Sequence, residues 1–374
     1  MLKAFTNCII YTGEEVLINK SGIVDGEKIV DVSNYIPENV QIIDLKGKSI
    51  APGLIDIQLN GGYYRYFSET PGMETLSEME QASRDYATPY FLATLISSPE
   101  EVILEAIEVI KNYKAANHRF LGMHLEGPFL NAQKRGAHHP AIVRLPTDRE
   151  LKTIIEKGSE VIKVITIAPE IFTDYQLDML LESGIIISAG HSTMTYEQAQ
   201  FYFSKGIHLV THLFNAMTQF GHREPGTVGA VFENDQVYAP VIVDGGHISY
   251  ATLRIARRLK GEKLFLITDS SFLGRKKTRF DWEGFNITME DGFYRDRFGN
   301  LAGAAISMPE AIKNTVLHLG ATLQEAIEMG TSRVARAIRM DGKIGFIKKG
   351  YPSESLIVFD DDFEEVRLLN HDFS

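Results

Sequence analysis

Eight short apolar runs, separated by stretches with a helical pattern, are the feature that most constrains the fold of this 374-residue chain. Each run has the length of a buried strand. The runs cover residues 53–58, 90–96, 120–126, 161–168, 184–191, 207–214, 239–244 and 264–269. Strands that alternate with helices are typical of a parallel sheet whose faces carry helices. Eight such units predict a (β/α)8 TIM-like barrel, and a doubly wound open sheet is the structural alternative.

Helix start signals lie between these runs. Thr147, Thr173 and Thr195 each stand three residues before a Glu or Gln, which is the capping-box pattern. Residues 99–113 repeat apolar side chains at helical spacing, so one face of that helix is expected to pack on the sheet.

The two ends of the chain differ from its middle. Asp25 and Gly26 stand between two apolar runs, which predicts a β-hairpin, and the last thirty residues also consist of short apolar runs and turns. We therefore expect residues 1–50 and 343–374 to form one small β-sandwich domain, with the hydrolase barrel in residues 51–342.

Composition excludes several functional classes. The net charge of −11 gives no electrostatic help in binding nucleic acid. The single cysteine, Cys8, rules out an intramolecular disulfide and a cysteine-based zinc site. The sequence contains no run of about 18 apolar residues, so no membrane span is predicted. The first residues lack the pattern of a signal peptide, and a cytoplasmic protein is therefore expected.

Polar residues gather where the predicted strands end, and in such barrels the chemistry lies at the carboxyl ends of the strands. A buried carboxylate such as Glu126 is costly without a partner. With His191 and His212 it makes a set of one carboxylate and two imidazoles that suits one Zn²⁺, with Fe²⁺ or Mn²⁺ as alternatives. Each histidine alone is more often a hydrogen-bonding side chain, but the joint occurrence favours a metal. The strand ends carry Gln58, Asn60, Glu126, Glu170, His191, His212, Asp244, His247 and Asp269.

Asp269 ends the eighth run. Beside a metal that lowers the pKa of water towards about 7, a carboxylate can take the proton of that water and return it to a leaving group. The alternative is that Asp269 caps the turn that follows it.

Seven motifs in order carry a resemblance to a known family. They are "APGLIDIQLNGG", "HLEGPF", "AGHST", "THLFNAM", "DGGH", "ITDSS" and "LAGAAISM". With them the chain resembles the N-acetylglucosamine-6-phosphate deacetylases of the amidohydrolase superfamily. The resemblance implies the barrel with its small β-sandwich. It also implies removal of acetate from N-acetylglucosamine 6-phosphate in amino-sugar catabolism, by attack of metal-bound hydroxide with Asp269 as acid and base.

The resemblance also assigns substrate contacts. His247 is implied to touch the substrate and to polarise the amide carbonyl. Arg223 is implied to meet the sugar phosphate, since a guanidinium suits that geometry, although an isolated loop arginine is more often simply solvated. Members of the family commonly form homodimers in which a partner loop can complete the site. The remaining implied contacts are Ala137, His138, Asn215, Ala216, Leu301, Ala302 and Gly303.

Several positions depart from related patterns. Gln58 and Asn60 stand where many amidohydrolases carry His-x-His, so these positions are interpreted as vacant second-metal positions and one metal per subunit is expected. Ala304 replaces a common serine, and Pro89 changes the start of the second strand. Residues 285–303 predict a hairpin that either flanks the site or decorates the surface.

Two other functions stay open. One is a deacetylase for a different N-acetylhexosamine 6-phosphate or a small amide, and the other is a sugar-phosphate sensor without turnover.

Overall fold

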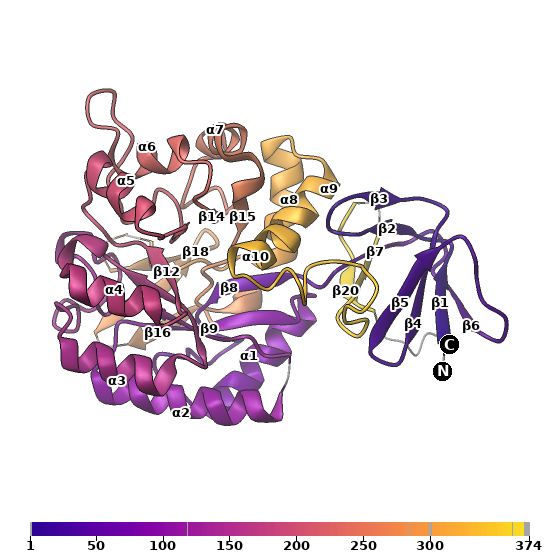
Figure 1. Ribbon diagram of the computed structural model, residues 1–374, viewed down its shortest axis with the longest axis horizontal. Helices are drawn as coiled ribbons and strands as arrows, with labels where there is room; N and C mark the ends of the chain where they lie inside the picture. The colour runs from indigo at the N-terminus through magenta and orange to yellow at the C-terminus, as the bar shows by residue number, and fades with distance from the viewer. Residues whose placement is uncertain are drawn as a thin grey trace.

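A computed structural model describes residues 2–117, 119–282, 284–297, 299, 301–360 and 362–369. The predicted domain segment 343–374 and the hairpin segment 285–303 each include a few positions outside these ranges. A large body of helices and strands stands beside a small all-β unit, which is at the right of the view (Figure 1).

The large body is built on parallel strands, and each of the eight predicted runs overlaps one of them. Six strands form one sheet in the order β13-β12-β11-β10-β9-β8, and two more pair separately as β14-β15. Parallel bridges also join Leu209 to Tyr238 and Leu59 to Ser270, at the two ends of the six-stranded sheet. The strands are β8 (Ile55–Leu59), β9 (Tyr90–Ile96), β10 (Gly122–Glu126), β11 (Ile162–Ile167), β12 (Ile186–Ala189), β13 (Leu209–Val210), β14 (Ala239–Val241) and β15 (Leu264–Leu266).

Helices follow the strands, as the pattern predicted. They are α1 (Met73–Asp85), α2 (Glu100–Ala116), α3 (Asp148–Gly158), α4 (Asp174–Glu182), α5 (Tyr196–Ser204), α6 (Gly226–Glu233), α7 (Tyr250–Lys260), α8 (Met308–Leu319), α9 (Leu323–Gly330) and α10 (Ser332–Ala337). Single 3-10 turns are η1 (Ala132–Lys134), η2 (Pro169–Ile171), η3 (Gly261–Lys263) and η4 (Leu273–Arg275). Throughout the described ranges, no helix is both long enough and apolar enough to cross a membrane.

Two of the three predicted capping boxes are complete. Thr173 and Thr195 each accept from the backbone of the third helical residue, whose glutamine side chain bonds back to the cap. Thr147 caps α3 in the same way, but the carboxylate of Glu150 pairs with Arg144 instead of the cap backbone. The prediction of a reciprocal box at this helix is therefore wrong, because a cation lies within reach of the acidic side chain.

The small unit consists of two sheets drawn from both ends of the chain. One has the order β5-β4-β1-β6 and the other β20-β19-β7-β2-β3. The predicted hairpin at Asp25 joins β4 to β5. Side chains such as Phe5, Ile10 and Val358 from the two sheets share one buried cluster. The strands are β1 (Leu2–Thr6), β2 (Ile9–Tyr11), β3 (Val16–Leu17), β4 (Ser21–Asp25), β5 (Lys28–Ser33), β6 (Gln41–Asp44), β7 (Ser49–Ala51), β19 (Ile357–Phe359) and β20 (Val366–Leu368).

A polar layer crosses the interior of the large body below the strand ends. The ring of His124 bonds Thr166 Oγ1 at 2.7 Å, and Thr166 bonds Thr211 Oγ1 at 2.7 Å. Ser188 Oγ lies 2.6 Å from the same Thr211 hydroxyl. Burial lowers the pKa of His124 to about 4, so its ring is neutral, and hydrogen bonds join these four side chains. It provides a rigid floor for the side chains that end the strands.

Candidate metal and substrate site

A cavity of about 230 Å³ opens at the carboxyl ends of the parallel strands. The structure brings together there every predicted site residue except Gln58 and Arg223. The predicted residues that line the cavity are Asn60, Glu126, Ala137, His138, His191, His212, Asn215, Ala216, His247, Asp269, Leu301, Ala302 and Gly303.

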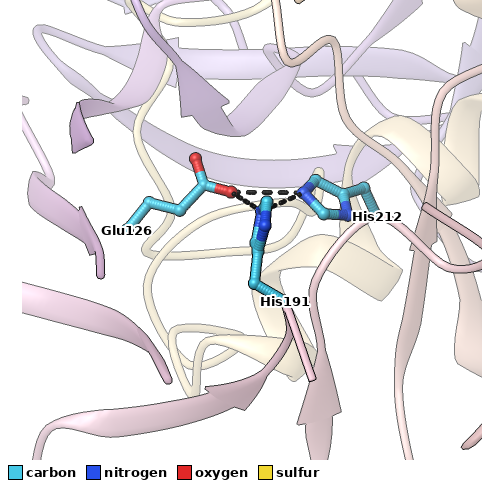
Figure 2. Close-up of side chains that lie close together, drawn as sticks. All are labelled: Glu126, His191 and His212. Carbon is cyan, nitrogen blue, oxygen red and sulfur yellow. Dashed lines mark hydrogen bonds and ion pairs between the residues drawn. The ribbon is translucent and has the colours of Figure 1, made fainter. Parts of the chain in front are cut away.

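Three of these side chains converge on one point. Glu126 Oε1 lies 3.0 Å from His191 Nε2 and 3.2 Å from His212 Nε2, and the two imidazole nitrogens are 3.1 Å apart (Figure 2). All three residues are buried. Two ring nitrogens and a carboxylate oxygen that face one another at this spacing have the donor set and the separation of a divalent metal site.

The hydrogen bonds around the cluster support this interpretation. His191 Nδ1 lies 2.9 Å from the carbonyl oxygen of Lys134, which can only accept, so Nδ1 carries a proton and Nε2 is the nitrogen that would bind a metal once it carries none. Burial raises the pKa of Glu126, but its bonds to His191 and His212 outweigh burial and hold that pKa well below the ordinary range. The carboxylate is therefore charged and ready for a cation.

The backbone at the strand ends is strained where the site residues stand. His191, His212 and Asp269 have φ values of 49°, 27° and 50°, in the left-handed region that few residues other than glycine adopt. Such strain persists only where the surrounding structure enforces it, and here it aims three side chains into one cavity.

Glu170 organises the loop that carries His191, a role that the sequence analysis did not assign to it. Its carboxylate accepts from the backbone N–H of Thr193 at 2.7 Å, from Ser192 Oγ at 2.8 Å and from Asn131 Nδ2 at 3.1 Å. Asn131 also donates its backbone N–H to the carbonyl of His191. These bonds fix the position of Ser192 and Thr193, which directly follow His191 in the chain.

Asp269 faces the same cavity. Its Oδ1 accepts from Gln58 Nε2 at 3.2 Å and from Asn60 Nδ2 at 2.9 Å. Burial first and the charge of Glu126 second raise the pKa of Asp269 to about 6. The hydrogen bonds to the Asp269 side chain thus come from Gln58 in β8 and from Asn60, which follows β8. They do not come from the turn after Asp269, which the alternative of a capping role predicted. The amides of Gln58 and Asn60, at the predicted vacant second-metal positions, therefore have Asp269 as their hydrogen-bond partner.

His247 is held by a carboxylate three residues away. Its Nδ1 lies 2.6 Å from Asp244 Oδ2, while the backbone N–H groups of Gly246 and His247 both donate to Asp244 Oδ1. Burial opposes ionisation of Asp244, but the bond to His247 prevails and lowers its pKa. Because Asp244 occupies Nδ1, Nε2 is the nitrogen that His247 offers to the cavity.

His138 lies directly beside the cluster. Its ring centre is 4.6 Å from that of His191, and its Nε2 is 4.0 Å from Glu126 Oε1. Burial and the neighbouring His191 lower the pKa of His138 to about 3, so it is neutral. Ser97 Oγ lies 2.8 Å from its Nδ1 and fixes the ring.

The segment that carries Leu301, Ala302 and Gly303 packs against the end of β15. The backbone N–H of Ala304 donates to the carbonyl of Asp269 at 2.9 Å. A Cβ at Gly303, whose φ is 76°, would lie 2.2 Å from Ser271 Oγ, so this close approach requires glycine.

A three-stranded sheet forms one wall of the cavity. Its strands are β16 (Arg279–Trp282), β17 (Phe285–Glu290) and β18 (Phe293–Asp296), in the order β16-β17-β18. Phe280 and Ile287 from this sheet line the cavity. The predicted hairpin is thus present and flanks the site, while its third strand was not predicted.

Arg223 is a predicted substrate contact that does not line the cavity. Its side chain is exposed and does not belong to the lining. Arg223 lies in a turn that the N–H of Gly221 closes on the carbonyl of Glu224. A charged side chain in such a turn is well solvated, which agrees with its exposed position away from the cavity.

The chain is similar to known proteins over nearly its whole length. The amidohydrolase family matches residues 49–372, and the NagA composite domain matches residues 3–50. The chain is 37% identical to N-acetylglucosamine-6-phosphate deacetylase of Haemophilus influenzae over 98% of its length and 97% of the relative. It is 33% identical to N-acetylgalactosamine-6-phosphate deacetylase of Shewanella sp. strain ANA-3, over 95% and 88% of the two chains. Its fold is similar to the crystal structure of N-acetylglucosamine-6-phosphate deacetylase from Pasteurella multocida, with a TM-score of 0.92 and 36% identity over 97% and 96% of the chains.

Proposed function

The chain belongs to the amidohydrolase family, and from this premise we propose that it is a metal-dependent deacetylase of N-acetylglucosamine 6-phosphate. The products are glucosamine 6-phosphate and acetate, as in amino-sugar catabolism. The observation that carries the proposal is the buried cluster of Glu126, His191 and His212 in a cavity that Asp269 and His247 also line. The chain is similar over nearly its full length to deacetylases of N-acetylglucosamine 6-phosphate, and this similarity supports that sugar phosphate as the substrate.

The residues divide the reaction between them. Asp269 takes a proton from the attacking water as oxygen adds to the acetyl carbon. Because Gln58 and Asn60 donate to Oδ1, the proton goes to Oδ2. Asp269 then gives the proton to the amide nitrogen as the carbon–nitrogen bond breaks, and acetate leaves. His247, oriented by Asp244 through Nδ1, directs Nε2 at the carbonyl oxygen; as the imidazolium, with both ring nitrogens protonated, it donates from Nε2 and stabilises the negative charge of that oxygen.

Glu126, His191 and His212 hold the metal in this proposal. A divalent ion bound there supplies the Lewis acidity that polarises the acetyl group and lowers the pKa of a water. Two imidazoles and one carboxylate suit Zn²⁺, and Fe²⁺ or Mn²⁺ are the alternatives. Gln58 and Asn60 already bond Asp269, so we propose one metal in each subunit.

Release of acetate from purified protein tests the function. We expect turnover of N-acetylglucosamine 6-phosphate and little turnover of unphosphorylated N-acetylglucosamine. The Shewanella relative makes N-acetylgalactosamine 6-phosphate the second candidate, and a panel with both phosphosugars decides which is preferred. Tight binding of either sugar without acetate release would support the sensor function and contradict the deacetylase.

Arg223 enters the proposal through a homodimer. Its side chain lies outside its own cavity, so we propose that it reaches the phosphate in the site of a second copy. Arg223→Ala is expected to raise KM about tenfold or more for the phosphorylated sugar, because a charge-assisted pair is lost. Measured KM values with both sugars are the test.

Two outcomes would count against this role of Arg223. One is an equal change in KM for the phosphorylated and unphosphorylated sugars. The other is a fully active monomer in solution.

The architecture completes the proposal. We propose that the bridges at Leu209 and Leu59 close the eight strands into a (β/α)8 barrel over residues 51–342. Residues 1–50 and 343–374 then form the second domain. A charged sugar phosphate does not cross membranes unaided, so the proposed location is the cytoplasm, where such sugars are held.

A further inference from the structure

Asn60 carries a buried polar atom for which the described part of the protein supplies no partner. Its side chain is 3% exposed and lines the cavity, yet its Oδ1 accepts no hydrogen bond. Within the described ranges, His212 is the only other cavity-lining residue with such an atom. Buried acceptors are nearly always satisfied, so an orphan acceptor on a residue that lines a binding cavity points to a donor that arrives with the ligand.

The orientation of the Asn60 amide follows from its other bond. Nδ2 lies 2.9 Å from Asp269 Oδ1, and an ionised carboxylate can only accept. The opposite orientation would set two acceptor oxygens against each other. The amide oxygen of Asn60 is therefore the end left without a partner beside Asp269.

We propose that Asn60 Oδ1 accepts the N–H of the substrate's acetamido group and keeps that bond as the nitrogen becomes an amine. This inference rests on the proposed function and adds a residue that recognises the scissile nitrogen. Asp269 must reach the same nitrogen to protonate it, and Asn60 bonds Asp269 through Nδ2. One amide thus holds the proton donor with one end and turns the nitrogen towards that donor with the other.

The geometry also gives Asn60 a role in specificity. An N–H at the scissile position satisfies Oδ1, whereas an ester oxygen at that position has no hydrogen to give. A buried polar group left unpaired is what makes a site reject an analogue. Asn60 therefore favours amides over esters of the same sugar phosphate.

Gln58 provides the matched control. Its Nε2 also donates to Asp269 Oδ1, at 3.2 Å, and it is buried, but it does not line the cavity. Gln58→Ala removes one donor to Asp269 and leaves the scissile nitrogen untouched. Asn60→Ala removes a donor to the same oxygen and also the orphan acceptor.

The experiment compares kcat/KM of the metal-loaded wild type and both variants on two substrates. These are N-acetylglucosamine 6-phosphate and 2-O-acetylglucose 6-phosphate, which carries an ester at the same position. We expect the preference for amide over ester to fall about tenfold further in Asn60→Ala than in Gln58→Ala, because only the former loses a bond that the ester cannot make. An equal fall in the two variants would overturn the inference and leave Asn60 as a positioning residue for Asp269.

Two measurements keep the outcome interpretable. Melting temperature and metal content establish that each variant is folded and has bound metal. If Asn60→Ala is not folded or does not bind metal, Asn60→Leu, whose side chain has a similar shape to asparagine, replaces it. A blocked cavity affects both substrates alike, so the amide-to-ester ratio remains decisive. Absence of turnover by the wild type would instead sink the proposed function.

Discussion

Replacing Asp269 by asparagine is expected to lower kcat by about 10² to 10⁴, the usual contribution of a general acid–base group, with the sugar phosphate still bound. Asparagine has the same shape as aspartate and keeps an oxygen that can accept from Gln58 and Asn60. It cannot take up and release the proton of the reaction. The variant should therefore retain the cavity and lose the chemistry.

The measurement has two arms. Initial rates of acetate release give kcat, and titration calorimetry with N-acetylglucosamine 6-phosphate gives the affinity of the variant, which no longer consumes its ligand. Asp269→Ala is the control, because it also removes the acceptor for Gln58 and Asn60 and should bind less well. A variant Asp269→Asn with the kcat of the wild type would exclude this residue as acid and base.

The strand ends could be predicted because parallel strands bring them to one edge. Once eight apolar runs alternate with helices, the residue after each run must face the same region. Glu126, His191 and His212 then converge although up to 86 positions separate them. The capping boxes at Thr173 and Thr195 were predictable for a different reason, because all their atoms lie within one turn.

What the sequence did not reveal are contacts that depend on side-chain positions in three dimensions. Asn60 and Asp269 are 209 positions apart, and nothing in either segment indicates that the amide of Asn60 will bond the carboxylate proposed as acid and base. The same applies to Glu170, which bonds the loop of His191 from the 3-10 turn η2. Glu150 shows the reverse case. The local pattern predicts a capping box, but the carboxylate of Glu150 forms an ion pair with Arg144 instead.

The polar support around the site explains how strained ligands can be held. His191 and His212 occupy the left-handed region, which costs free energy of order 1 kcal/mol or more each. Glu170, Asn131 and the carbonyl of Lys134 fix the backbone and the ring of His191. The side chains proposed to bind the metal are thus preorganised, because they already point at one another in the structure.

Loss of one ligand is therefore expected to cost the metal as well as the activity. In the metal-free protein, burial opposes protonation of His212, but its bond to Glu126 prevails and raises its pKa. His212→Asn should reduce the bound metal far below one ion per chain and abolish turnover. Chelation of the wild type should do the same, and added Zn²⁺ should restore the wild type alone.

Thermal stability separates binding from catalysis in this test. A ligand at 100 times its Kd stabilises the folded state by about 2.7 kcal/mol, so metal should raise the melting temperature of the wild type by several degrees. His212→Asn should show no such rise. His247→Asn is the matched control, since it alters a cavity histidine outside the cluster and should keep both the metal and the rise while losing turnover. Full metal content in His212→Asn would place the ion elsewhere, whereas loss of metal in His247→Asn would add His247 to the ligands.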